Sequence, residues 1–92
     1  MLAINISTPN SIMQNLKDKF KQKRLSLNLT QEGLSNKSGV SLGSIKRFET
    51  TGQISLLSLT KIAVALNIAD DLRNIFTEIP YNSIEEVINE TR

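Results

Sequence analysis

The side chains best suited to binding chemistry lie together in residues 29–49, LTQEGLSNKSGVSLGSIKRFE. In a helix that begins after Ser41, the apolar residues Ile45 and Phe48 point inward, which leaves one outward row. This row comprises Leu42, Gly43, Ser44, Lys46 and Arg47. The guanidinium group of Arg47 can donate two parallel hydrogen bonds to one guanine. The row therefore favours binding of a ligand, by its basic and hydroxyl groups, over catalysis.

The composition argues against an enzyme or a metal protein. The 92 residues contain no histidine and no cysteine, which removes the commonest general base and the commonest metal ligands. We therefore expect no catalytic site, no metal and no cofactor. No apolar run approaches the roughly 20 residues that span a bilayer, and residues 1–10 do not resemble a signal peptide. We expect a cytoplasmic protein without a membrane segment.

The charge is distributed unevenly along the chain. Residues 1–61 hold nine Lys or Arg against three acids, whereas residues 62–92 hold two Arg against six acids. A basic front and an acidic tail are typical of proteins that bind a polyanion on one side. Charge alone leaves an unevenly charged, solvated surface as an equal alternative.

Apolar side chains recur with a period near 3.6, which predicts an all-α protein. The helix starts are marked by Thr8 with Pro9, Thr30, Ser41, Ser55, and Asp70 or Asp71. Gly39 and Gly52 are predicted to end the second and third helices in a left-handed conformation. The predicted inward residues are Ile12, Leu16, Phe20, Leu34, Val40, Ile45, Phe48, Leu56, Leu59, Ile62, Ala63, Leu66, Leu72, Ile75 and Phe76.

We divide the chain into a five-helix domain, residues 9–77, and two flanks, residues 1–8 and 78–92. Alternating Leu2, Ile4 and Ile6 predict a short N-terminal strand. After Pro80, a capping box formed by Ser83 and Glu86 predicts a last helix bearing Ile84, Val87 and Ile88.

The second and third predicted helices are spaced as a helix-turn-helix. Ser35 is small enough for a close helix crossing, and Gly39 supplies the positive φ of the turn. Val40, Ile45 and Phe48 attach the second helix of the pair to the core. This arrangement presents that helix to the major groove of DNA.

These residues resemble the lambda-repressor-like helix-turn-helix family, also called the Cro/C1 or XRE family, and the similarity extends from about Leu16 to Leu66. The resemblance implies a five-helix bundle and assigns roles to residues. It implies phosphate contacts from Gln31 and Thr30, base-facing positions for Leu42, Gly43 and Arg47, and positions near bases or phosphates for Ser41, Ser44 and Lys46. Leu42 and Gly43 depart from the polar residues often found there, so direct base readout depends mainly on Arg47. Arg24 and Glu49 match an ion pair between the first and third helices, which we prefer to DNA contact by Arg24.

A second resemblance lies in SLGSIKRFETTGQISLLSLTKIAVALNI and in YNSIEEV, which are similar to HipB-like antitoxins. It implies a homodimer that binds a palindromic operator of its own operon and also binds a HipA-type kinase toxin. Apolar residues that could form a dimer interface are Leu2, Ile4, Ile6, Leu72, Ile75, Phe76, Ile84, Val87 and Ile88. The alternative is that they complete the core of one chain.

The sequence thus predicts a DNA-binding repressor, with the antitoxin as the favoured biological setting. Two alternatives remain open at this point. One is a phage-type repressor of the same fold. The other is a protein-interaction module with weak DNA binding, which the apolar Leu42 and the bare Gly43 would favour.

Overall fold

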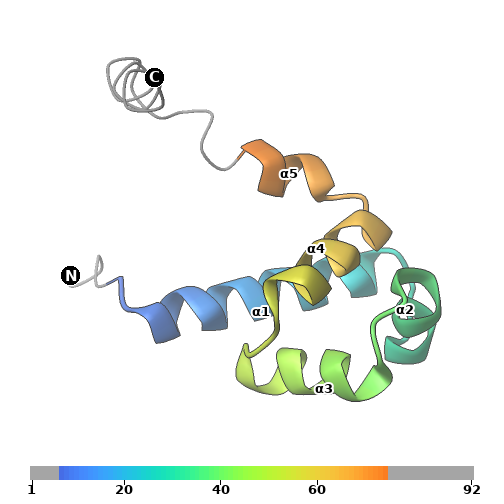
Figure 1. Ribbon diagram of the computed structural model, residues 1–92, viewed down its shortest axis with the longest axis horizontal. Coiled ribbons are helices and arrows are strands. Elements are labelled where there is room, and N and C mark those ends of the chain that lie inside the picture. Colours follow the sequence, from blue (N-terminus) through green and yellow to red (C-terminus); the bar gives the residue numbers. More distant parts are fainter. Residues whose placement is uncertain (1–6, 75–92) are drawn as a thin grey trace, which may run out of the picture.

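The computed structural model describes residues 7–74, and these form five helices and no strand. They are α1 (Pro9–Ser26), α2 (Gln31–Ser38), α3 (Leu42–Thr51), α4 (Leu56–Ala65) and α5 (Ala69–Arg73). Figure 1 shows α3 and α5 on opposite sides of α1, with α2 at one end of the bundle. For these residues the predicted all-α fold with five helices is confirmed. The predicted N-terminal strand and last helix fall outside the described residues, as do Ile75 and Phe76. None of the described helices has the length and apolarity required to cross a membrane.

The four predicted hydroxyl caps all begin helices. Thr8 and Ser11 form a reciprocal capping box, with both N–H to Oγ distances at 3.0 Å. Thr30, Ser41 and Ser55 each accept a hydrogen bond from a backbone N–H in the first turn of their helix. Each such cap contributes about 1 kcal/mol, so the helix starts are fixed locally. The fifth helix begins at Ala69, and Asp70 and Asp71 lie in its first turn rather than at its cap.

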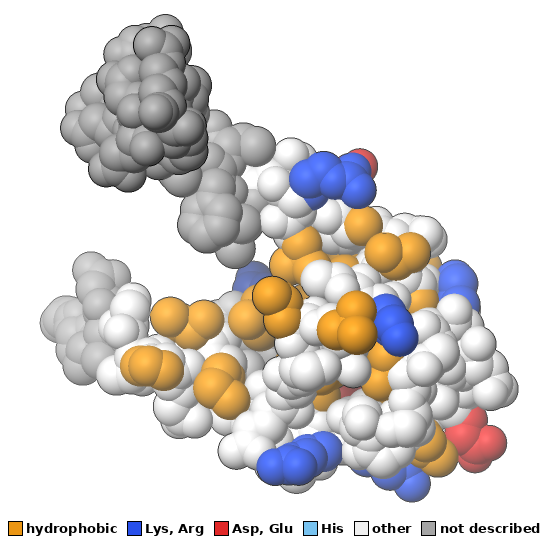
Figure 2. Space-filling model, in the orientation of Figure 1, with side chains coloured by type: hydrophobic (Ala, Val, Ile, Leu, Met, Phe, Trp, Pro, Cys, Tyr) orange, Lys and Arg blue, Asp and Glu red, His pale blue; other side chains and the backbone are white. Residues whose placement is uncertain are grey.

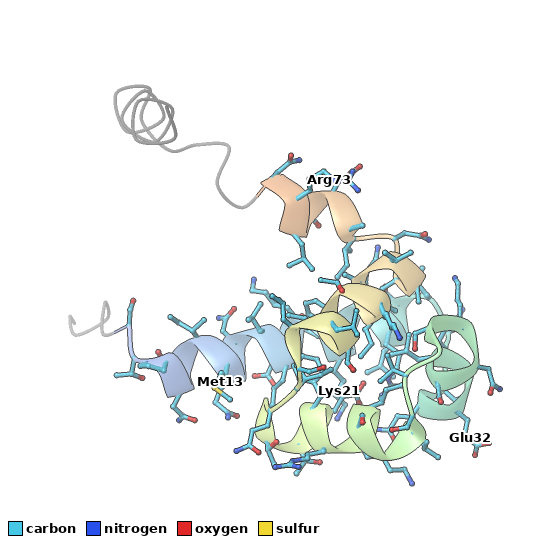
Figure 3. All side chains as sticks on the ribbon, in the orientation of Figure 1. Met13, Lys21, Glu32 and Arg73 are labelled. Carbon is cyan, nitrogen blue, oxygen red and sulfur yellow. The ribbon has the colours of Figure 1, made fainter. Side chains whose placement is uncertain are left out.

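The two predicted glycine ends are also confirmed, and they differ in their surroundings. Gly39 ends α2 with φ 78° in open space, so only its backbone conformation requires glycine. Gly52 ends α3 with φ 82°, and a Cβ there would lie 3.1 Å from the Met13 Cβ and 3.2 Å from the Met13 carbonyl oxygen. Figure 3 shows Met13 on α1. Gly52 therefore also allows the close approach of α3 to α1.

The core lies where α1 to α4 converge. The fully buried large side chains are Leu34, Ile45, Ile62 and Leu66. Phe20 from α1 and Phe48 from α3 meet edge to face, with ring centroids 5.6 Å apart, a favourable geometry for aromatic pairs. This contact holds α3 against α1 from the inner side.

Two predicted core residues are exposed. Ile12 is 52% exposed and Leu56 is 75% exposed. Both follow the apolar period, but both lie near the start of a helix. In Figure 1, α1 extends past the other helices at its N-terminal end, so nothing in the described bundle covers Ile12. Leu56 is the first residue of α4. Periodicity identifies the face of a helix, but it does not show how far the neighbouring helices extend.

Candidate nucleic-acid interface

The turn between α2 and α3 is held by a side-chain hydrogen bond and by buried apolar side chains on both sides of it. The Ser35 hydroxyl donates a 2.6 Å hydrogen bond to the Val40 carbonyl oxygen, which joins α2 to the residue just beyond the turn. The Val40 side chain is buried, as are Leu34 before the turn and Ile45 after it. Ser35 was predicted only as a small residue, so this hydrogen bond is an additional function of its side chain. The hydrogen bond and the buried side chains together hold α2 and α3 as one two-helix unit.

The outward row of α3 has the predicted orientation at its charged end. Gly43, Lys46 and Arg47 are exposed, whereas Leu42 and Ser44 are partly buried. Figure 2 shows basic side chains along the edge of the molecule that α3 forms in Figure 1. Because Ile45 and Phe48 are buried on the opposite side of α3, the helix can present Lys46 and Arg47 to a ligand without rearrangement.

Arg47 is held in place by Gln53, a residue that the sequence pattern does not indicate. Its Nη2 donates to the Gln53 Oε1 at 2.6 Å, and both side chains are exposed. Gln53 follows the end of α3 at Gly52. The guanidinium therefore has a defined direction, with its other N–H groups available for a base or a phosphate.

A shallow depression of about 320 Å³ lies beside Arg47, between α3 and the start of α4. Its polar lining includes Ser44, Gln53, Ser55 and Ser58. Ser55 and Ser58 were not predicted as site residues, because their positions near α3 depend on how α4 packs. The Ser55 hydroxyl oxygen already accepts a hydrogen bond from the Ser58 backbone N–H.

The hydroxyls of Ser41 and Thr30 serve as helix caps. The Ser41 hydroxyl accepts from the Ser44 backbone N–H at 3.2 Å and donates to the Ser44 Oγ at 2.8 Å. The Thr30 Oγ1 accepts from the Gly33 backbone N–H at 2.9 Å. Both residues mark helix N-termini, where backbone N–H groups favour an anion.

Glu49 lies at the centre of a polar network that joins three helices. Its two carboxylate oxygens accept from Arg24 Nε at 2.7 Å and Arg24 Nη2 at 3.0 Å. Gln31 Nε2, at the start of α2, donates to the same carboxylate at 3.0 Å. Arg24 Nη1 in turn donates to the Leu29 carbonyl oxygen at 2.7 Å. The Arg24–Glu49 pair is therefore structural, as predicted, and the hydrogen bond from Gln31 is new.

The network is shielded from solvent, and this determines its electrostatics. The Arg24 and Glu49 side chains are 8% and 5% exposed. Burial of the carboxylate raises the pKa of Glu49, but the hydrogen bonds from Arg24 and Gln31 and the charges of Arg24 and Lys21 outweigh this effect. The pKa of Glu49 is lowered below its ordinary value of 4.5. Glu49 is therefore ionised at neutral pH.

In the described structure, the predicted residues lie at the starts of two consecutive helices, α2 and α3, and along α3. Thr30 and Gln31 lie at the start of α2, Ser41 caps α3, and the rest follow on α3. The residues on α3 are Leu42, Gly43, Ser44, Lys46 and Arg47. Figure 3 shows Glu32 at the outer side of α2 and Arg73 at the far end of the molecule on α5.

Comparison with known proteins gives one result of consequence. A family model described as helix-turn-helix matches residues 20–72, from Phe20 in the middle of α1 to Leu72 in α5. The matched range contains α2, α3, α4 and both glycine turns. No curated protein gives a significant match to the chain.

Proposed function

Because the helix-turn-helix model matches more than half of the chain, the protein belongs to the Cro/C1 helix-turn-helix family of DNA-binding transcription regulators, and we propose that it is a sequence-specific repressor. The observation that carries the proposal is the two-sided structure of α3. Ile45 and Phe48 fix its inner side in the core, while Lys46 and Arg47 are exposed on the outer side.

In the proposed complex, α3 enters the major groove and Arg47 reads one guanine through two hydrogen bonds. The side-chain Oε1 of Gln53 accepts a 2.6 Å hydrogen bond from Arg47 Nη2, which reduces the conformational entropy lost when Arg47 binds. Leu42 contacts a thymine methyl group, and Gly43 lets the helix backbone approach the bases closely. With so few reading side chains, DNA shape contributes to selectivity.

Phosphates are contacted by residues at the edges of the two helices. Gln31 is the main candidate, because its Nε2 donates one N–H to Glu49 and retains a second N–H. Thr30, Ser41, Ser44 and Lys46 complete the proposed phosphate contacts. These contacts position the protein on the duplex but do not read sequence.

One helix-turn-helix reads only a half-site, so we propose that two copies bind a palindromic operator with half-sites about 34 Å apart. The exposed apolar side chains of α4 support a homodimer. Leu56, Leu57 and Val64 are all more than half exposed, and Figure 2 shows apolar groups on the face that α4 presents. Among the interface candidates from the sequence, Leu72 alone lies within the described residues, and its partly buried side chain packs against the core.

We further propose that the repressor is the antitoxin of a HipBA-like operon, which represses its own promoter and binds a HipA-type kinase toxin. This rests on the resemblance of the segments KRFE, SLLSL and YNSIEEV. Co-expression with the product of an adjacent kinase-like reading frame, followed by size-exclusion chromatography, tests it. Separate elution of the two proteins would contradict toxin binding but not DNA binding.

DNA binding itself is tested by selecting sequences from a random duplex pool and measuring affinity at two salt concentrations. Specific binding persists at moderate salt, whereas non-specific binding falls steeply as counterion release loses its driving force. Failure to enrich any sequence would favour the interaction module, for which Leu42 and Gly43 are the supporting residues. Arg47→Lys is the control variant, since it retains the charge but not the paired hydrogen bonds.

A further inference from the structure

An apolar groove lies between α1 and α5, away from the proposed DNA face. Its volume is about 370 Å³. Leu16 and Phe20 from α1 form one wall, and Ile68 and Leu72 form the other. In Figure 1, α3 lies on the other side of α1 from α5. DNA contact by α3 therefore does not explain this groove.

The charges at the rim of the groove indicate what it binds. Lys19 and Lys23 lie one helical turn apart on α1 and both line the groove. In residues 7–74, neither lysine forms an ion pair, since the pairs there involve Lys17, Arg24 and Arg73. Asp71 is the one acid that lines the groove. A matching ligand has an apolar stripe flanked by carboxylates.

The chain itself contains such a segment shortly after the groove. Residues 83–90 read SIEEVINE. In a helix, Ile84, Val87 and Ile88 share one face, and Glu85 and Glu90 flank it on either side. The stretch 75–92 has four acids and one arginine, so its net charge is opposite to that of the rim.

We propose that residues 83–90 bind in the groove between α1 and α5 of the same chain as an amphipathic helix. Ile84, Val87 and Ile88 then pack on the apolar walls, and the glutamates pair with Lys19 and Lys23. The assignment gives a role to the capping box at Ser83, which DNA binding leaves unused, and it completes the core on the far side of α1.

The connection is long enough. Leu72 lines the groove, and the chain continues from Asn74, the last described residue, to Ser83 over nine peptide units. These span up to about 30 Å when extended. Pro80 lies within the connection, where proline favours a turn over a continuous helix. The segment can therefore fold back without displacing α5.

The absence of cysteine permits a clean test on the full chain. A spin label is attached through Asn89→Cys, a position off the apolar face, and the methyl signals of Leu16, Ile68 and Leu72 are recorded by NMR. The proposal expects at least a threefold intensity loss at these methyls relative to the reduced label. The same intensity loss must occur when the spin-labelled, NMR-visible chain is diluted tenfold with chain that carries neither the spin label nor NMR-visible methyl groups.

Equal intensities with the label oxidised and reduced would overturn the proposal. Broadening only in a mixture of spin-labelled silent chains and label-free visible chains would overturn it too, because the segment would then occupy the groove of a second copy. The double variant Lys19→Glu, Lys23→Glu should reduce the broadening at least twofold at low salt. Its matched control, Lys37→Glu, Lys61→Glu, makes the same charge change on α2 and α4 and should leave the broadening unchanged.

Discussion

Replacement of Glu49 by alanine should destabilise the domain far more than an ordinary surface change. The substitution leaves the Arg24 guanidinium, which is 8% exposed, without its two charged hydrogen bonds. Removing one partner of a buried pair costs about 3–5 kcal/mol, because the other charge stays buried without compensation. A small domain has about 5–15 kcal/mol of stability in total. Glu49→Ala should therefore lose a large share of it.

The loss is measured by urea unfolding followed by circular dichroism at pH 7. For a domain of this size, each kcal/mol shifts Tm by about 4–8 °C, so thermal melting should show a decrease of at least 12 °C. The double variant Arg24→Met, Glu49→Leu is the control. It should recover most of the stability, because apolar side chains of similar volume replace the pair without burying a charge. A single-variant loss below about 1 kcal/mol would refute the view that this pair is shielded from solvent.

Four further predictions concern the site and its scaffold. Arg47→Ala should weaken operator binding by about 1–3 kcal/mol and relax preference at one base pair; equal losses on all sequences in fluorescence anisotropy would show a phosphate contact only. Gln31→Ala should weaken binding with sequence preference unchanged, and a shifted preference in a selection experiment would contradict a phosphate contact. Gly52→Ala should cost more in urea unfolding than Gly39→Ala, for which we expect about 1–2 kcal/mol from backbone conformation alone; equal costs would show that contact with Met13 is negligible. The pKa of Glu49 is lowered in the folded state, so ionised Glu49 stabilises the folded protein, and this stability should be fully present above about pH 4.5. It should decline as the pH falls through the folded pKa of Glu49. The Arg24→Met, Glu49→Leu variant should lack this pH dependence in urea unfolding.

Local chemistry explains why so much of this fold is readable from sequence. A hydroxyl cap such as Thr8 bonds a backbone group only three residues away, and Gly39 is needed for its own φ. Such signals do not depend on distant residues. The exposure of Ile12 and Leu56 near the starts of their helices, in contrast, is determined by how far the neighbouring helices extend. Periodicity within one helix carries no information about that.

The site divides in the same way. The exposed residues of α3 were predictable because the helical period alone determines which side chains share a face. The hydrogen-bond partners of Arg47 and Gln31 were not predictable in this way. The bond between Arg47 and Gln53 depends on how the chain leaves Gly52. The bond between Gln31 and Glu49 spans 18 positions and two helices. The sequence resemblance assigned Glu49 to Arg24 alone, and only the packed structure shows that it has a second donor.

That second donor links stability to the proposed recognition. Glu49 binds Arg24 with both oxygens and Gln31 with one of them, so the carboxylate that attaches α3 to α1 also orients the amide at the start of α2. An amide held in this way keeps one Nε2 hydrogen directed away from Glu49, where a phosphate can accept it. The buried ion pair contributes little net free energy by itself, because desolvation offsets its attraction. Its value to this protein lies instead in fixing α1, α2 and α3 in one geometry, with the Gln31 amide and the exposed row of α3 oriented before DNA arrives.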